Sequence, residues 1–282
     1  MALLQVNFFS GCFKHSVALN VLIPSDFTGP PELAPPLGPY KTVYLLHGYR
    51  GNSTSWLLNS QVEEISRNFN IAIVMPSGYN GFYVDAPRSG VRGSEFIGRE
   101  LIEFTRKMLP LSHKREDTIL AGFSMGSYGT IYNSLKHGDV FGHAIALSAP
   151  IIPDRRLSEN EPTNINLGQT EGFFRALHGD TDKIMQTDRN LALLAKQTLG
   201  SGRPVSDLYV ACGYNDMLVY ENRDFVNQLK AMDFPHFFEE GPGSHEWMFW
   251  NAFLKRGLRR AIGDEQYIMP NPFWVDAEGS VV

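Results

Sequence analysis

The stretch Asp117-Thr118-Ile119-Leu120-Ala121-Gly122-Phe123-Ser124-Met125-Gly126-Ser127-Tyr128-Gly129 decides the fold. It begins as an apolar run typical of a buried strand, turns tightly at Ser124, and continues with a pattern that favours a helix. Gly122 and Gly126 flank the serine at positions where a side chain would collide with a neighbouring element. This order predicts a nucleophile elbow, in which Ser124 is exposed at the C-terminal edge of a sheet.

The rest of the chain alternates apolar strand-like runs with helical patterns. This alternation predicts an α/β fold with a mostly parallel central sheet and helices on both faces. The predicted parallel strands are 42–46, 71–76, 117–123, 143–148, 207–213 and 236–240, and the predicted helices outside the elbow are 55–67, 95–109, 220–232 and 247–261. Two further runs, 2–9 and 17–23, predict an antiparallel hairpin at the edge of the sheet.

The domain organisation follows from length and composition. The chain has 282 residues, within reach of one large α/β domain, and no composition break or internal repeat divides it. We therefore predict a single domain over 1–282. The region 151–200 is the least regular part, although 170–199 has a mostly helical pattern, and we predict that it forms a small cap insertion.

Charge and composition exclude several classes of partner. The chain carries 25 Lys and Arg against 30 Asp and Glu, whereas nucleic acid and anionic membranes select clustered basic residues. No apolar run reaches membrane-spanning length, and the first residues alternate as a strand does instead of resembling a signal peptide. We expect a cytoplasmic location. The two cysteines, Cys12 and Cys212, each fall in a strand-like run and imply no disulfide framework.

A serine hydroxyl needs a base to take its proton, usually a histidine that a carboxylate orients. On a sheet with this elbow the partners follow in the order Ser, Asp or Glu, then His, each after the end of a strand. Of the eight histidines, only His245 follows a late strand in a Gly-rich loop. Asp216 lies just beyond the preceding strand and is placed to orient His245. Weaker alternatives for the carboxylate are Asp180, Asp182 and Asp188.

Attack by Ser124 on a carbonyl would create an oxyanion, which needs N–H donors. The N–H of Met125, directly after the nucleophile, is the first expected donor. The loop after the 42–46 strand supplies the second, which we expect to be Tyr49 N–H, with Gly48 allowing close backbone approach. His47 is expected to hold this loop by hydrogen bonds. The chemistry requires no metal or organic cofactor.

Five motifs in this chain resemble the esterase D-like group of α/β-hydrolases. They are LLHGYRGNSTSW (45–56), VMPSG (74–78), GFSMG (122–126), CGYND (212–216) and GSHEW (243–247). The group includes tributyrin esterases, S-formylglutathione hydrolases, acetyl xylan esterases and feruloyl esterases. The opening segment ALLQVNFFS (2–10) is similar to that of the bacterial tributyrin esterase branch.

The resemblance implies the α/β-hydrolase fold, the same triad and oxyanion donors, and hydrolysis of short acyl esters from acetyl to butyryl. An S-formylglutathione hydrolase-like thioesterase and a carbohydrate acetyl or feruloyl esterase use the same triad and stay open as alternatives. A non-catalytic binding protein on this fold is disfavoured because all three triad residues are present. The resemblance also implies that the chain can form homo-oligomers.

Candidate substrate contacts lie near the predicted triad loops. Gly48, Tyr83 and Trp247 are expected to contact a small-molecule ester. Phe173 and Phe174 of the predicted cap could add to the wall of an apolar acyl pocket.

Overall fold

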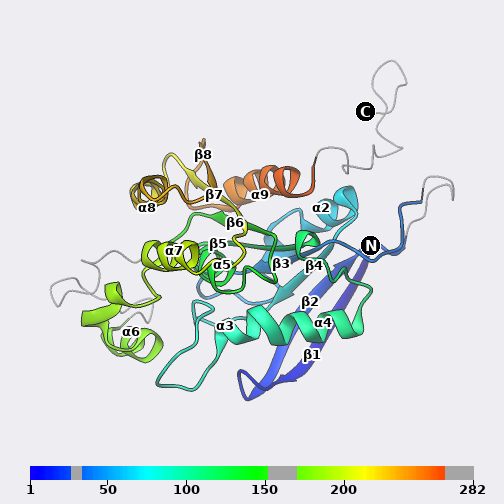
Figure 1. Ribbon diagram of the computed structural model, residues 1–282. Helices are drawn as coiled ribbons and strands as arrows, with labels where there is room; N and C mark the ends of the chain where they lie inside the picture. Colours follow the sequence, from blue (N-terminus) through cyan, green and yellow to red (C-terminus); the bar gives the residue numbers. More distant parts are fainter. Residues whose placement is uncertain (27–33, 152–169, 264–282) are drawn as a thin grey trace.

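The central sheet has eight strands in the order β1-β2-β4-β3-β5-β6-β7-β8. They are β1 (Ala2–Ser10), β2 (His15–Ile23), β3 (Thr42–Leu46), β4 (Ala72–Pro76), β5 (Thr118–Phe123), β6 (His143–Leu147), β7 (Asp207–Gly213) and β8 (His236–Gly241). The structure, a computed structural model, describes residues 1–26, 34–151 and 170–263. Figure 1 shows the β1–β2 hairpin at one edge of the sheet and β8 at the other.

Strand direction brings the ends of distant segments together. The pairs β1–β2 and β2–β4 are antiparallel, whereas β3, β4, β5, β6, β7 and β8 pair in parallel. The C-terminal ends of β3, β5, β7 and β8 therefore meet at one edge of the sheet, where chemistry is expected in such folds. The predicted edge hairpin and mostly parallel sheet are confirmed.

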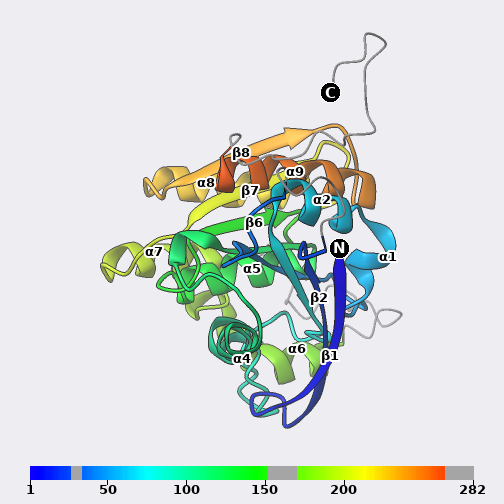
Figure 2. The same ribbon diagram turned by 90° about the vertical axis from the view of Figure 1, so that its right-hand side faces the viewer.

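Helices cover both faces of the sheet (Figure 2). One face packs against α4 (Leu101–Met108), α5 (Met125–Lys136), α7 (Leu191–Gly200) and α8 (Val219–Ala231), and the other against α1 (Ser55–Asn59), α2 (Val62–Phe69) and α9 (Trp247–Ile262). The remaining helical segments are α3 (Gly93–Glu95), η2 (Phe96–Glu100), η3 (Arg115–Asp117), α6 (Glu171–His178) and η6 (Thr181–Gln186). Because β3, β4 and β5 are buried on both faces, their sequences are almost continuously apolar, whereas the parallel edge strand β8 is only partly buried and carries Glu239 and Glu240.

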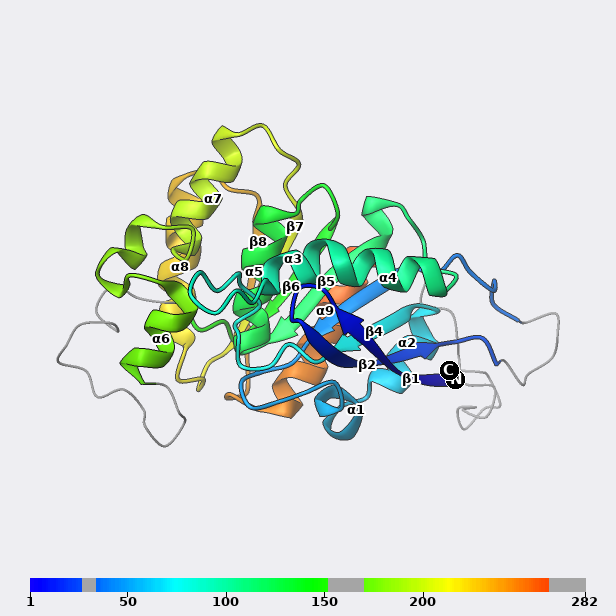
Figure 3. The same cartoon turned by 90° about the horizontal axis from the view of Figure 1, so that it is seen from below.

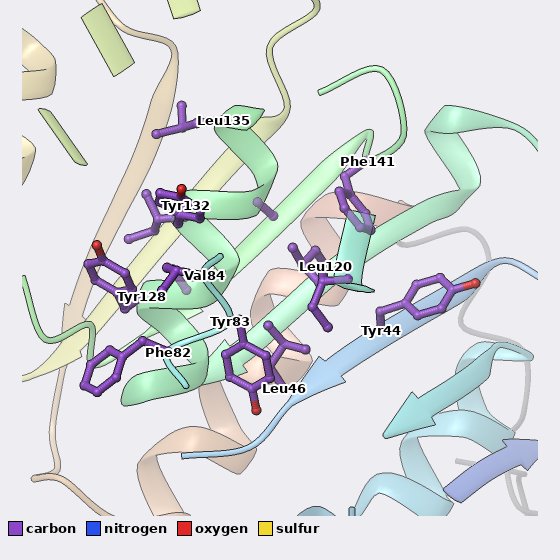
Figure 4. Packing of buried hydrophobic residues seen from close by; sticks show 14 of the residues in the cluster. Tyr44, Leu46, Phe82, Tyr83, Val84, Leu120, Tyr128, Tyr132, Leu135 and Phe141 are labelled. Atoms are coloured by element: carbon purple, nitrogen blue, oxygen red, sulfur yellow. The ribbon is translucent and has the colours of Figure 1, made fainter. Parts of the chain in front are cut away.

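Large side chains fill the space between α5 and the sheet. Figure 4 shows Tyr128 and Tyr132 on α5, with Phe82 and Tyr83 packed beside them. The Tyr83 ring lies so close to Gly129 that a Cβ there would stand 2.5 Å from it. This packing holds the loop after β4 against the helix that follows Ser124.

The structure differs from two expectations. The predicted helix 55–67 is broken into α1 and α2, because the Ser60 hydroxyl donates to Trp56 O (2.5 Å) and Gln61 N–H donates to the Asn251 side chain. Cys12 lies in the β1–β2 turn and not in a strand, although it is buried as expected. Of the predicted cap, 152–169 lie outside the described residues, while α6 and α7 lie at the end of the molecule away from the N-terminus (Figure 3).

Candidate active site

Ser124 occupies the predicted sharp turn between β5 and α5. Its backbone has φ 53° and ψ −125°, a strained conformation typical of a nucleophile elbow. A Cβ on Gly122 would stand 2.6 Å from Gly126, and a Cβ on Gly126 would stand 2.6 Å from Leu46 O. Both glycines are therefore required for the close packing of β5, α5 and β3 that presents the serine.

His245 and Asp216 complete a chain of hydrogen bonds with Ser124. His245 Nε2 lies 3.0 Å from Ser124 Oγ, and His245 Nδ1 lies 3.0 Å and 3.2 Å from the two carboxylate oxygens of Asp216. Since a carboxylate only accepts, Nδ1 carries the proton and Nε2 is free to accept the serine proton. The three side chains that the sequence singled out therefore meet with the connectivity of a Ser-His-Asp triad.

The Asp216 side chain is fully buried. Burial alone would raise the pKa of its carboxyl, but hydrogen bonds from His245, from the Ser148 hydroxyl and from Leu218 N–H outweigh burial and hold the pKa below its usual value. The Leu218 N–H donates to Oδ1 at 2.9 Å. The carboxylate is thus ionised at neutral pH and faces the protonated nitrogen of the imidazole.

Backbone contacts hold the Asp216 and His245 loops together. Tyr214 N–H donates to Gly241 O (2.9 Å), and Asn215 N–H donates to Gly243 O (3.0 Å). Gly213 lies against the same loop, because a Cβ there would overlap Gly243 O. The separation between His245 and Asp216 is therefore set by the backbone as well as by their own hydrogen bonds.

His47 anchors the loop after β3 as predicted. Its Nδ1 donates to Gly48 O (2.7 Å), and its Nε2 accepts from Gly78 N–H (2.9 Å). Burial lowers the pKa of His47 to about 4, so the ring is neutral and can both donate and accept. Tyr83 donates its hydroxyl proton to His47 O (2.9 Å). The loop that carries Tyr49 is thus tied to the loop after β4.

The three predicted substrate contacts lie in different surroundings. Gly48 packs against the Phe123 ring, which a Cβ would overlap, and Trp247 is half-buried with its ring 4.7 Å from that of Phe123. Tyr83 is almost completely buried behind the His47 loop. The Tyr49 ring is half-buried and meets Phe173 of α6 edge-on at 6.0 Å.

Three further observations on the described residues concern clefts, metal ions and membranes. A mainly apolar cleft of about 300 Å³ lies between the Tyr79–Gly81 loop, Phe13 and α6, and the candidate triad does not line it. Over 1–26, 34–151 and 170–263, no three His, Cys, Asp or Glu side chains are grouped to hold a metal ion. None of the helices in these ranges is long and apolar enough to cross a membrane.

The fold and site define the class of protein. A mostly parallel eight-stranded sheet covered by helices, with a serine on a strand-to-helix elbow, is the architecture of an α/β-hydrolase. The family model described as "Putative esterase" matches residues 10–261. The chain therefore belongs to this esterase family and is a carboxylesterase.

Similar proteins agree with this assignment. The chain is 35% identical over 255 residues to an acetyl esterase of Caldicellulosiruptor saccharolyticus, covering 90% of this chain and 96% of the relative. It also resembles the fluorophosphonate-binding serine hydrolase F (FphF) of Staphylococcus aureus, with a TM-score of 0.81, 26% identity and coverage of 93% and 99%. The S-formylglutathione hydrolase (FrmB) of Staphylococcus aureus gives a TM-score of 0.77 and 27% identity, with the same coverage.

Proposed function

We propose that this carboxylesterase hydrolyses short-chain acyl esters, from acetyl to butyryl, by way of Ser124, His245 and Asp216. The observation that carries the proposal is the unbroken hydrogen-bond chain from Ser124 Oγ through His245 to the buried Asp216 carboxylate. The similarity to an acetyl esterase favours small acyl groups.

The reaction has two halves. Ser124 Oγ attacks the ester carbonyl while His245 Nε2 takes the hydroxyl proton, and the negative oxygen of the tetrahedral intermediate accepts hydrogen bonds from the N–H groups of Tyr49 and Met125. His245 then gives its proton to the leaving alcohol, which leaves an acyl-enzyme on Ser124. Water, deprotonated by His245, attacks the acyl group; His245 then returns the proton to Ser124 Oγ as the bond to the acyl group breaks, and the carboxylic acid leaves. Asp216 stabilises the positively charged imidazole in both halves.

Aromatic side chains on and near the loop after β3, which carries Tyr49, limit the size of the acyl group. Tyr49 and Trp247 are half-buried. Phe173 of α6 contacts Tyr49, and Trp247 packs on Phe123, the ring that lies against Gly48. We assign Tyr49, Trp247 and Phe173 to the wall of the acyl site, with α6, η6 and α7 as its cap. Tyr83 supports this wall indirectly. Its hydroxyl donates to His47 O, and its ring packs against Gly78, so it holds the loop after β3 in place.

A thioester is the second candidate substrate. The similarity to FrmB favours it, and the same triad would perform the acyl transfer, with a thiol in place of an alcohol as leaving group. A cytoplasmic location and self-association remain predictions from the sequence.

The test is a rate profile over p-nitrophenyl acetate, butyrate and octanoate and an S-acyl glutathione, for wild type and Ser124→Ala in parallel. We expect fast turnover of acetate and butyrate, slow turnover of octanoate, and a loss of about a thousandfold or more in the variant. Faster turnover of the thioester than of any ester would favour the second candidate. Retention of wild-type rates by Ser124→Ala would overturn the triad assignment.

A further inference from the structure

Ser148 lies between the strands that carry Ser124 and Asp216. It follows the last residue of β6, Leu147, whose carbonyl accepts the Ser124 N–H at 2.9 Å. The Ser148 N–H donates to Ala211 O on β7 at 2.8 Å. Its side chain is completely buried. Ser148 is therefore held by backbone bonds at the sheet edge where the candidate triad assembles.

The backbone of Ser148 adopts a conformation that a serine does not favour. Its φ is 55°, in the left-handed region where glycine is tolerated without steric cost and other residues are strained. A serine at such a position keeps its hydroxyl at the expense of backbone stability. Strain of this kind clusters at functional sites, so the contacts of the hydroxyl indicate what role Ser148 has there.

The hydroxyl of Ser148 has a defined direction. The indole N–H of Trp250 donates to Ser148 Oγ at 3.0 Å, so the oxygen acts as acceptor toward the indole and keeps its own proton for another partner. The neighbouring groups are the Asp216 carboxylate and the Cys212 thiol. The carboxylate is the stronger acceptor, because a thiol sulfur accepts only weakly.

Trp250 also contacts His245 of the candidate triad and Phe123, the residue before Ser124. Its ring stands at 89° to the His245 imidazole with 5.0 Å between centroids, and it stacks on Phe123, next to Ser124, at 4.2 Å. The side chain is buried in the first turns of α9. One indole thus touches the imidazole of His245 and the hydroxyl of Ser148.

We propose that Ser148 and Trp250 are positioning residues of this esterase. Trp250 directs the Ser148 proton to the Asp216 carboxylate and supports the His245 ring, so that both partners of Ser124 are held in line. The proposal rests on the proposed function, because it concerns the geometry of the same triad. The lowering of the Asp216 pKa by the Ser148 hydroxyl is consistent with this arrangement.

The first test replaces Ser148 by glycine and, in parallel, by alanine. Glycine removes the hydroxyl and also relaxes the positive φ, so the variant is not expected to unfold. We expect kcat to fall about tenfold or more in both variants, with KM little changed, because a hydrogen bond to a charged group is lost. Equal losses in the two variants assign the effect to the hydroxyl and not to the volume of the side chain.

The pH profile separates positioning from a merely structural role. A carboxylate that has lost a donor attracts the imidazolium more strongly, so the acid limb of kcat/KM should move to higher pH in Ser148→Gly. Trp250→Phe keeps a ring beside His245 and removes the indole N–H, and should move the limb in the same direction. The control is Ser206→Ala, which also removes a buried serine hydroxyl. That hydroxyl donates to the backbone oxygen of Phe141 at 2.8 Å and not to a residue of the candidate triad, so this variant should keep the wild-type pH profile.

A double-mutant cycle with Asp216→Asn tests whether Ser148 acts through Asp216. In the Asp216→Asn background, Ser148→Gly should cost little further activity, because the charged acceptor is already gone. Wild-type rate and pH profile in Ser148→Gly, or a full tenfold loss on top of Asp216→Asn, would overturn the proposal. If Ser124→Ala is inactive while Ser148→Gly matches wild type, only the positioning role fails, and the triad assignment stands.

Discussion

His47 shows how one buried side chain can hold a loop, here the loop after β3 that carries Tyr49. Its two ring nitrogens bond Gly48 O and Gly78 N–H, and its carbonyl accepts from Tyr83. These bonds need the neutral ring, which burial favours. The sequence predicted this structural role because His47 precedes the elbow and stands in the loop expected to supply an oxyanion donor.

Replacing His47 by alanine should therefore impair catalysis through the loop. We expect kcat to fall by about a hundredfold, the cost of a misplaced oxyanion donor, while KM for p-nitrophenyl acetate changes little. Steady-state kinetics on folded protein, verified by thermal unfolding, would measure the effect. His113→Ala, at an exposed histidine, is the control. A variant with wild-type kcat would show that the loop keeps its geometry without the imidazole.

The loops after β7 and β8 act as a unit. The N–H groups of Tyr214 and Asn215 donate to the carbonyls of Gly241 and Gly243, and Gly213 packs directly on Gly243. Asp216 and His245 thus reach each other because two parallel neighbouring strands end at the same level, as their register from Leu208–His236 to Gly213–Gly241 shows. Glycine is needed at the contact because two backbones meet there.

Gly213→Ala should push these loops apart and separate Asp216 from His245. We expect kcat/KM to fall by about a hundredfold or more, since small displacements of catalytic groups are costly. The matched control is Gly200→Ala at the end of α7, where nothing lies within 4 Å of the new Cβ. The control should keep full activity and gain slightly in thermal stability. Equal kinetics in both variants would contradict the packing argument.

The segment from α6 to α7 shows where local patterns stop predicting structure. Residues 170–199 were expected to be mostly helical, and α6, η6 and α7 confirm this. The contact of Phe173 with Tyr49 joins segments that are far apart in the chain, and no local pattern sets its geometry. Likewise, the break between α1 and α2 depends on Asn251, far along the chain.

Three histidines are buried in the molecule and make its stability sensitive to acid. Burial lowers the pKa of His47 and of His137 to about 4, and that of His178 to about 3. In the unfolded chain a histidine has a pKa of about 6.5. As the pH falls below this value, the unfolded chain binds protons that the folded chain does not, so the free energy of unfolding must fall.

This linkage predicts a pH window. As the pH falls from about 6.5 toward about 4, the free energy of unfolding should fall with a slope that approaches about 1.4 kcal/mol per pH unit for each of the three histidines. Urea unfolding at a series of pH values from about 7.5 to about 5 would measure the slope. His137→Gln removes one of the three groups and should make the slope shallower by about 1.4 kcal/mol per pH unit. A flat profile would show that these rings are protonated in the folded protein.

The sequence by itself determined the sheet, the elbow and the candidate triad. Buried parallel strands must be continuously apolar, a strand-to-helix turn at Ser124 needs its flanking glycines, and groups after strand ends must gather at one edge. These are local or topological constraints, so they can be read along the chain. Asp216 and His245 could be chosen for this reason, before their 3.0 Å contact was known.

Only the tertiary structure decided how this triad is supported. Ser148 and Trp250 are 102 positions apart, and no local pattern links them. The sequence placed Ser148 at the end of the predicted strand 143–148, but its positive φ appears only in three dimensions. Tyr83 was expected at the substrate and lies buried behind the His47 loop. Such contacts depend on packing between distant segments, which the order of residues does not reveal until the chain is folded.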